Sequence, residues 1–202
     1  MTFSLTARCP GTGAFGIAIS SSSPAVAARC THLRPGIGAA ASQNITDPRL
    51  GGRLLDRLAA GDSAAEAMAA VVAADPTADY RQLTVVDTAG RAAGHSGRHT
   101  LGLHYLVVGD GAVAAGNLLA SAGVIDVMLE AFEHNPAGTL AARLLHALTA
   151  ALSAGGEAGP VFGPGGLGVG VDAVAELEQL VGGGADPGPG LVFGGHWSPG
   201  TP

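Results

Sequence analysis

The sequence predicts an α+β domain built from two antiparallel sheets, with a pair of helices on the outer side of each sheet. Apolar residues first alternate with polar ones, as in half-buried strands, and then recur every three to four positions, as in amphipathic helices. This change of period occurs twice. Strands, two helices, strands and two helices therefore follow one another, instead of the alternating units of a parallel sheet. At 202 residues the chain has the length of one domain.

The first strands are predicted to form a hairpin. Large apolar side chains alternate with Thr2 and Ser4 at the start of the chain, which is the pattern of a strand beginning at the second residue. The Pro- and Gly-containing residues 10–13 indicate a turn, and residues 15–19 alternate again. The small apolar residues of 37–42 predict a third strand.

The first helix pair is predicted at residues 47–60 and 63–74. Leucines recur at helical spacing in the first segment, where Asp47 is the expected N-cap. In the second segment Ser63 and Glu66 have the spacing of a capping box. The two short helices are therefore joined by a tight turn.

The second half of the chain repeats this order. Strands are expected at 81–86, 91–95, 103–108 and 113–115, and helices at 122–133 and 138–152. A strand at 167–171 and a helix at 172–181 complete a single domain of residues 1–181. Residues 182–202 are rich in Gly and Pro, so they are predicted to form a disordered tail. The apolar stripes of the four helices are expected to be buried at Leu54, Leu58, Val71, Met128 and Leu148.

Composition excludes several classes of function. Charged residues make up 13% of the chain, the formal net charge is -6, and all ten basic residues are arginines. The absence of lysine excludes Schiff-base chemistry and the phosphate-binding lysine of a P-loop. Scattered arginines offer no basic surface for nucleic acid, and no apolar run reaches the length of a membrane span. The low charge also predicts a homo-oligomer, most simply a dimer, because a monomer would expose much apolar surface.

The two cysteines, Cys9 and Cys30, form no disulfide framework and predict reduced thiols. The opening residues show no targeting segment, so a cytoplasmic location is expected. Cys30 and His32 would share one face of a strand, but no carboxylate orients the histidine. A buried structural thiol is therefore favoured over a nucleophile pair.

Two further motifs resemble binding sites. The glycines of 11–16 match a dinucleotide fingerprint, but the segment continues into a strand rather than a helix and is interpreted as a hairpin turn. His95, His99 and His104 are close in sequence. On strands they would not share one face, and no nearby carboxylate completes a ligand set. No metal is predicted.

Thr2 is the most informative position. A small residue behind the initiator methionine favours removal of Met1, which would leave Thr2 with a free α-amino group. In an N-terminal nucleophile the hydroxyl attacks a carbonyl carbon while that amine, with an ordinary pKa of about 7.7–8.0, accepts the proton. Many proteins have a small second residue without this role, so Thr2 alone does not decide the function.

Several segments of the chain, in order, resemble one bacterial family. These are the opening residues 1–4 and residues 21–30, 42–51, 79–82, 94–97, 115–120 and 154–160. Together they are similar to the "domain of unknown function 1028" family over about residues 1–160. Beyond Pro160 the sequence departs from the family pattern, because the usual additional strand and acidic segment are shortened.

The resemblance implies a fold and a chemistry. The family is placed among the N-terminal-nucleophile (Ntn) hydrolases, which share a four-layer αββα sandwich and mostly cleave amide bonds. Thr2 would then be the nucleophile. The resemblance further implies that Asn44 positions the amine or the substrate and that His95 and Asn117 donate to an oxyanion. Residues implied to bind the substrate are Ser22, Arg29 and Gln43. The structural alternatives are helix capping for Asn44 and a turn for Asn117.

Two functions follow from these observations. The first is a cofactor-independent amidohydrolase that cleaves a carbon–nitrogen bond of a small molecule. The second is a non-catalytic small-molecule-binding or scaffold protein that retains the sandwich. The state of Met1 distinguishes them, because a chain that keeps Met1 lacks the free amine of Thr2.

Overall fold

The computed structural model describes residues 2–23, 25–135, 138–158 and 190–196. Its strands form two sheets. The first sheet has the order β7 (Tyr105–Gly109), β8 (Ala112–Asn117), β1 (Thr2–Arg8), β2 (Phe15–Ser21) and β9 (Gly190–His196). The second sheet has the order β3 (Thr31–Arg34), β4 (Gly38–Asn44), β5 (Arg81–Asp87) and β6 (Ala92–Ser96). All neighbouring strands are antiparallel except β9, which runs parallel to β2.

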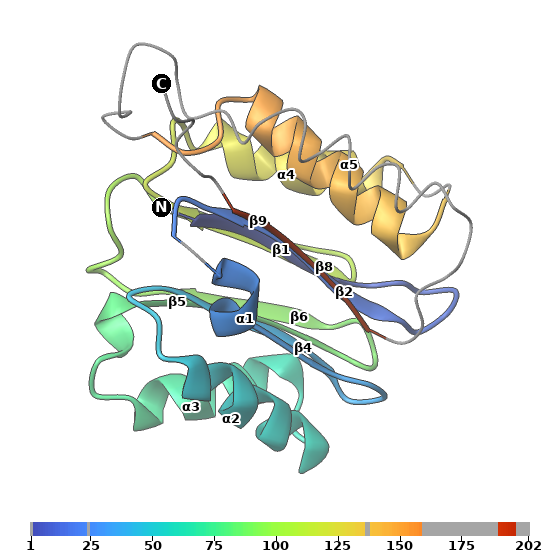
Figure 1. The fold of residues 1–202 in the computed structure, drawn as a ribbon. Coiled ribbons are helices and arrows are strands. Elements are labelled where there is room, and N and C mark those ends of the chain that lie inside the picture. The colour runs from blue at the N-terminus through green and yellow to red at the C-terminus, as the bar shows by residue number, and fades with distance from the viewer. Residues whose placement is uncertain (1, 24, 136–137, 159–189, 197–202) are drawn as a thin grey trace.

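Helices cover the outer face of each sheet (Figure 1). The first sheet packs against α4 (Gly123–Glu133) and α5 (Leu140–Ser153). The second packs against α2 (Pro48–Ala59) and α3 (Ala64–Ala74). The predicted α+β class, with two antiparallel sheets and outer helix pairs, is confirmed. The stripe residues are also buried, with exposed fractions of 8% or less at Leu54, Leu58, Val71, Met128 and Leu148.

The alternation in β1 determines how the two sheets meet. Phe3 and Leu5 pack against α4 and α5. The intervening side chains point the other way, toward the second sheet. There the Ser4 hydroxyl donates to Gln43 over 2.7 Å, and the hydroxyl oxygens of Thr6 and Thr84 lie 2.8 Å apart. The space between the sheets is therefore polar along β1, and Thr2 shares its face with these residues.

The helix boundaries lie within two residues of their predicted positions. The Asp47 carboxylate accepts a hydrogen bond from the Arg49 backbone N–H, as an N-cap does. Ser63 and Glu66 form the predicted capping box, in which each side chain bonds the backbone N–H of the other residue. The glycine-rich segment after β1 is the hairpin turn that joins β1 to β2, which agrees with its predicted interpretation.

Two short elements were not predicted, and they change the placement of Cys30 and His32. Cys30 ends the five-residue helix α1 (Val26–Cys30), whereas His32 lies in β3. The expectation that they share one face of a strand was therefore wrong. His32 packs against the backbone of Gly51, where an added Cβ would lie 2.0 Å from the imidazole.

The C-terminal expectations have a mixed outcome. The strand and helix predicted at 167–171 and 172–181 lie outside the described residues. Within the expected tail of 182–202, residues 190–196 form β9 and pair with β2 along its whole length. The physical reason is that β2 is otherwise an edge strand, whose unpaired backbone groups can accept a further strand. The other residues of the expected tail lie outside the described ranges.

Candidate functional site

Thr2 begins the middle strand of the first sheet and lies between the last residues of its two neighbours. Its cross-strand partners are Ser21 of β2 and Asn117 of β8. Thr2 is 6% exposed, and its Oγ1 lies 3.0 Å from the Ser21 hydroxyl oxygen. Ser21 in turn accepts a hydrogen bond from the Ser23 backbone N–H over 3.1 Å. A hydroxyl group is therefore held on the inner face, at one end of the space between the sheets.

A buried amide network lies behind Thr2. Gln43 donates to the Gln82 side-chain oxygen over 2.8 Å and to the Ala115 carbonyl over 3.2 Å. Asn117 donates to the same Gln82 oxygen over 3.2 Å. Each of the three amide side chains is at most 1% exposed. Buried amides need hydrogen-bond partners, so this network fixes the orientation of Asn117 beside Thr2.

The structure places Asn117 beside Thr2, whereas the side chain of Gln43 is fully used in the buried amide network. Both protons of the Gln43 amide are donated within the protein, and its oxygen accepts from Ser4. The prediction that Gln43 binds substrate is therefore not supported by its contacts. The turn alternative for Asn117 also fails, because Asn117 is the last residue of β8.

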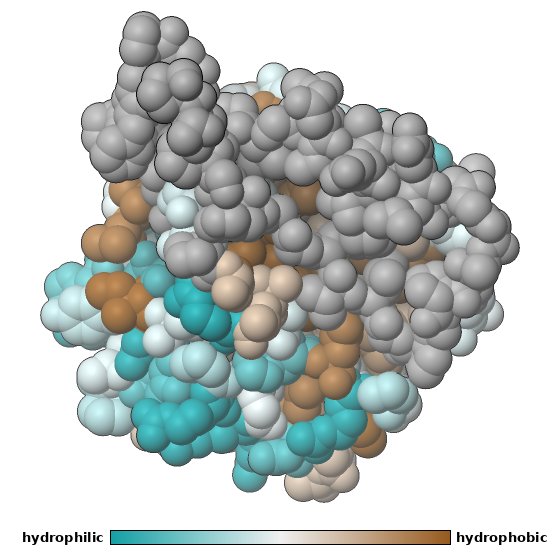
Figure 2. Space-filling model, viewed as in Figure 1, coloured by the Kyte–Doolittle hydropathy of each residue, from teal (hydrophilic) through white to brown (hydrophobic). Residues whose placement is uncertain are grey.

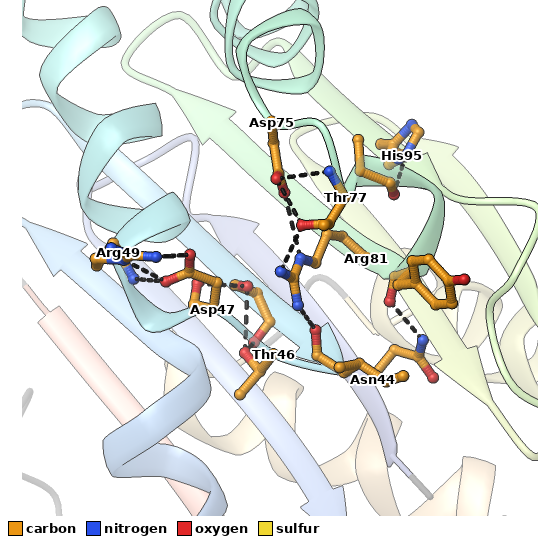
Figure 3. Close-up of polar contacts among 12 residues, drawn as sticks. Asn44, Thr46, Asp47, Arg49, Asp75, Thr77, Arg81 and His95 are labelled. Atoms are coloured by element: carbon orange, nitrogen blue, oxygen red, sulfur yellow. Dashed lines mark hydrogen bonds and ion pairs between the residues drawn. The ribbon is translucent and has the colours of Figure 1, made fainter.

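The structure places Asn44 at the end of β4 and His95 in β6, both in the second sheet (Figure 3). Gln43 points between the sheets, but the positive φ of Asn44 means that strand alternation does not fix the direction of its side chain. His95 pairs in register with Leu83, whose side chain belongs to the outer helix-facing core. The Nε2 atom of His95 lies 3.0 Å from the Ala78 carbonyl oxygen. His95 therefore points away from the space that contains Thr2, which does not support its predicted role, whereas the predicted role of Asn44 stays a prediction.

Asn44 has a structural role that differs from the capping role considered above. Its amide donates to the Tyr80 carbonyl over 2.7 Å and accepts from the Leu101 backbone N–H over 3.2 Å. Nearby, Arg81 donates to Asp75 over 3.2 Å and also to the Ile45 carbonyl (Figure 3). These contacts tie the end of β4 to the segments that precede β5 and β7.

The other predicted substrate-binding residues lie beyond the end of β2. Ser22 is partly buried and follows Ser21 directly, whereas Arg29 is exposed on α1. The expected histidine positions also differ from the prediction. His95 is in β6, but His99 and His104 lie outside the strands. Among the described residues no group of three or more His, Cys, Asp or Glu side chains is placed to hold a metal ion.

Sequence reasoning missed Glu157, which lies at the same end of the molecule as Thr2. The segment around Glu157 pairs with the residues after β8: Leu119 and Glu157 form an isolated bridge, and the Ala158 N–H donates to the Leu118 carbonyl over 2.7 Å. The carboxylate accepts a hydrogen bond from the Ser22 backbone N–H. Its Oε1 atom is buried and has no hydrogen-bond partner among the described residues.

Burial raises the pKa of Glu157 to about 7, while the positive amino terminus and the Ser22 N–H act in the opposite direction. The contacts with Ser22 and Leu119 place this carboxyl group beside the residues that follow Ser21 and Asn117, the two strand partners of Thr2. The only sequence signal for Glu157 was its place in the family-like segment 154–160. It belongs to no helix or strand whose periodicity predicts its burial.

Comparison with known proteins assigns the chain to a family. A family model described as a family of unknown function, DUF1028, matches residues 2–167. The chain belongs to this family. A crystal structure of a DUF1028 protein from Silicibacter pomeroyi is similar to it, with 34% sequence identity and a TM-score of 0.73. That similarity covers 76% of this chain and 68% of the other. No curated protein compared with the chain matches it.

Backbone strain in this DUF1028 protein gathers around the same end of the sheets. The described residues other than glycine with positive φ are Ala25, Asn44 and Leu118. Leu118 follows the partner of Thr2, and Ala25 follows the loop after β2. Such conformations cost about 1–3 kcal/mol each for ordinary residues and concentrate at functional sites. The strain supports the Thr2 end as the candidate site.

No helix in the described ranges is long and apolar enough to cross a bilayer.

The raised pKa of Glu157 predicts a pH-dependent stability. The folded state holds this proton more tightly than the unfolded state, so the stabilising contribution is complete below about pH 4.3. It is lost as the pH rises through about 7. The free energy of unfolding of Glu157→Gln, relative to that of the wild type, should therefore rise by about 1–3 kcal/mol from pH 5 to pH 8. Urea unfolding at both pH values measures this change.

The matched control is Glu130→Gln, which changes an exposed glutamate of α4. This variant should follow the wild type at both pH values. An equal stability difference between wild type and Glu157→Gln at pH 5 and pH 8 would contradict the shifted titration of Glu157.

Proposed function

We propose that this DUF1028 protein is an Ntn hydrolase that cleaves an amide bond of a small molecule, with Thr2 as the nucleophile after removal of Met1. The observation that carries the proposal is the placement of Thr2. It begins the middle strand, faces the space between the sheets and lies between Ser21 and Asn117. The helix–sheet–sheet–helix arrangement agrees with the four-layer αββα sandwich of that superfamily.

The proposed reaction needs no cofactor. The Thr2 hydroxyl attacks the carbonyl carbon of the amide while the α-amino group of the same residue accepts its proton. The carbon–nitrogen bond then breaks, and the leaving amine departs with that proton. Water hydrolyses the resulting ester and restores the Thr2 hydroxyl. Asn117 is proposed to donate its second amide proton to the oxyanion, since its contact with Gln82 uses one of the two.

Glu157 is proposed as a positioning residue for the free amine. The positive charge of the chain's amino terminus acts on its carboxyl group, and its Oε1 has no partner among the described residues. A carboxylate beside an ammonium group satisfies both, and hydrogen bonding holds the amine in one orientation. Ser22 donates its backbone N–H to the same carboxylate. Ser22 and Arg29 would then lie where a substrate approaches from the α1 side.

Two measurements test the proposal in sequence. Intact-mass analysis of untagged protein should show a chain that lacks Met1. The same protein is then incubated with a library of small linear amides, and amine release is compared among wild type, Thr2→Ser and Thr2→Ala. We expect hydrolysis by the wild type, a reduced rate for Thr2→Ser and none for Thr2→Ala. Equal hydrolysis by Thr2→Ala would exclude Thr2 as the nucleophile.

One observation favours the non-catalytic alternative. Thr2 is only 6% exposed, which restricts access to its hydroxyl. A small-molecule-binding or scaffold protein with the same sandwich would retain Met1 or show no amide hydrolysis with any library member. Retention of Met1 on the purified chain would favour this alternative, because the amine of Thr2 would then be acylated.

We also propose that the protein is a homodimer. Apolar side chains are exposed around the loop between β6 and β7, at Leu101 (46%), Leu103 (47%) and Tyr105 (38%). Figure 2 shows apolar surface at the left edge of the molecule, where Figure 1 draws this loop. A symmetric interface there would cover it. Light scattering should give twice the chain mass of 19.7 kDa, and a value near one chain mass would overturn the dimer.

A further inference from the structure

A cavity lies at the end of the sandwich opposite Thr2. It has a volume of about 320 Å³, and its lining includes Arg8 at the end of β1 and Arg143 of α5. The turns between β5 and β6 and between β7 and β8 close its other sides. Because β1 rises roughly 3.3 Å per residue, this cavity is about 20 Å from Thr2 and forms a separate site.

Arg143 is held in a fixed orientation and lacks one hydrogen-bond partner. Its guanidinium lies over the Phe132 ring, 4.0 Å from the ring centroid, and its Nη2 donates to the Phe132 carbonyl over 3.0 Å. The residue is 9% exposed. Its Nε atom is buried and has no partner among the described residues. The buried Nε is out of reach of a ligand, but the guanidinium as a whole carries a fixed positive charge at the lining of the cavity.

Arg8, the last residue of β1, also has a side-chain nitrogen without a hydrogen-bond partner in the described part of the chain. This Nε atom is buried. Its backbone N–H donates to the Gly111 carbonyl over 2.8 Å, which anchors the end of β1 to the β7–β8 turn. Within the described ranges neither Arg8 nor Arg143 is within ion-pair distance of a carboxylate. Two guanidinium groups thus line one cavity without acidic partners.

The cavity also contains two acidic residues, which restrict the ligand chemistry. The Glu133 Oε1 accepts from the Asp110 backbone N–H over 3.2 Å and so supports the β7–β8 turn. The Asp110 side chain is at the exposed side of the cavity. Two positive and two negative side chains balance one another. A doubly charged phosphate would meet repulsion from both carboxylates, whereas a carboxylate that also carries an ammonium group matches both kinds of charge.

We propose that this cavity binds a small amino carboxylate, meaning an amino acid or a short peptide. Its carboxylate would bind between Arg8 and Arg143, whose planar guanidinium groups suit carboxylate oxygens. Its ammonium group would point toward Asp110. The volume of about 320 Å³ is at the lower end of small-molecule sites, which agrees with a ligand of this size.

Cys9 provides an independent reporter beside this site. Burial raises the pKa of its thiol, but hydrogen bonds from Thr12 and Gly11 and the charge of Arg143 outweigh that effect, so the pKa is lowered. A carboxylate bound to Arg143 would offset part of this positive charge. Ligand binding should therefore raise the pKa of the Cys9 thiol and slow its alkylation by iodoacetamide near neutral pH.

Titration calorimetry on the full chain tests the proposal. The probes are the common amino acids and alanyl-alanine, with acetate, ethylammonium and inorganic phosphate as single-charge or dianion comparisons. At least one zwitterion should bind about tenfold more tightly than acetate or ethylammonium. The same zwitterion should slow alkylation of Cys9.

Arg8→Gln and Asp110→Asn should each weaken that binding by about tenfold. They are chosen because Arg143 also packs on Phe132, so its substitution disturbs the fold. Arg53→Gln is the matched control, since Arg53 lines a different cavity between α2 and α3. Unchanged affinity in Arg8→Gln, tighter binding of phosphate than of any zwitterion, or no zwitterion binding below about 10 mM would overturn the proposal.

Discussion

Fusion of an uncleavable tag directly ahead of Thr2 is expected to abolish amide hydrolysis while leaving thermal unfolding nearly unchanged. In the proposed mechanism the nucleophile and its base belong to one residue, so any acyl group on the amine removes the base. Loss of a general base lowers turnover by roughly 10²–10⁴-fold. The rate of the untagged protein should also fall at low pH, as the amine is protonated around or below about pH 8.

The matched control carries the same tag after Pro202, which leaves the amine of Thr2 free. This protein should hydrolyse the amide at the rate of the untagged chain. Thr2→Ser, with its amine free, should also retain measurable activity. Full activity in a protein whose tag and Met1 remain attached would contradict the proposed role of Thr2, whatever the behaviour of the other variants.

Periodicity in the sequence was sufficient to predict most of the fold. The alternation that begins at Thr2 gave the first strand, and the leucine spacing after Asp47 gave a helix whose observed bounds are Pro48–Ala59. Capping residues indicated where a helix begins, because Ser63 and Glu66 satisfy specific backbone donors at the start of α3. These signals are local. They depend on neighbouring positions in one element and not on how the elements pair.

The candidate site was less predictable because its residues depend on pairing between strands. In β4 the residues from Ala39 to Ala41 are all small and apolar, so hydropathy does not show which face is inward. The structure shows that Gln43 points inward and that Asn44 contacts the segments before β5 and β7. Likewise, the register with Leu83 places His95 on the outer face. The choice of face therefore separates the predicted His95 from Thr2.

Short or isolated elements escaped prediction for a related reason. α1 and β3 have five and four residues, too few for a period to appear. Glu157 makes a single isolated bridge with Leu119, so no repeating pattern indicates its burial. Its position depends on chain segments that are distant in sequence. A buried carboxyl group with a raised pKa could be found only from the folded arrangement.

Gln82→Leu is expected to cause the largest loss of stability among substitutions near the site. The Gln82 oxygen accepts from Gln43 and Asn117, and its amide donates to the Gly116 carbonyl over 2.9 Å. Leucine would leave the Asn117 amide and one of the two Gln43 N–H donors without their acceptor, and the Gly116 carbonyl would lose a donor, at about 1–3 kcal/mol for each unsatisfied group. The free energy of unfolding in urea should fall by roughly 3–5 kcal/mol. Any activity should fall as well, since Asn117 loses its orienting contact.

Thr84→Val is the control that separates this effect from a general change in the core. Thr84 lies on the same strand and the same face as Gln82, and its hydroxyl oxygen lies 2.8 Å from that of Thr6. Its loss should cost only about 1 kcal/mol, because the Thr6 hydroxyl can rotate to another acceptor. If Gln82→Leu is no more destabilising than Thr84→Val, the amide network does not hold the two sheets together at the Thr2 end. A larger loss for Gln82→Leu, with an unchanged dependence on urea, would identify the network as the link between the stability of the sandwich and the geometry around Thr2.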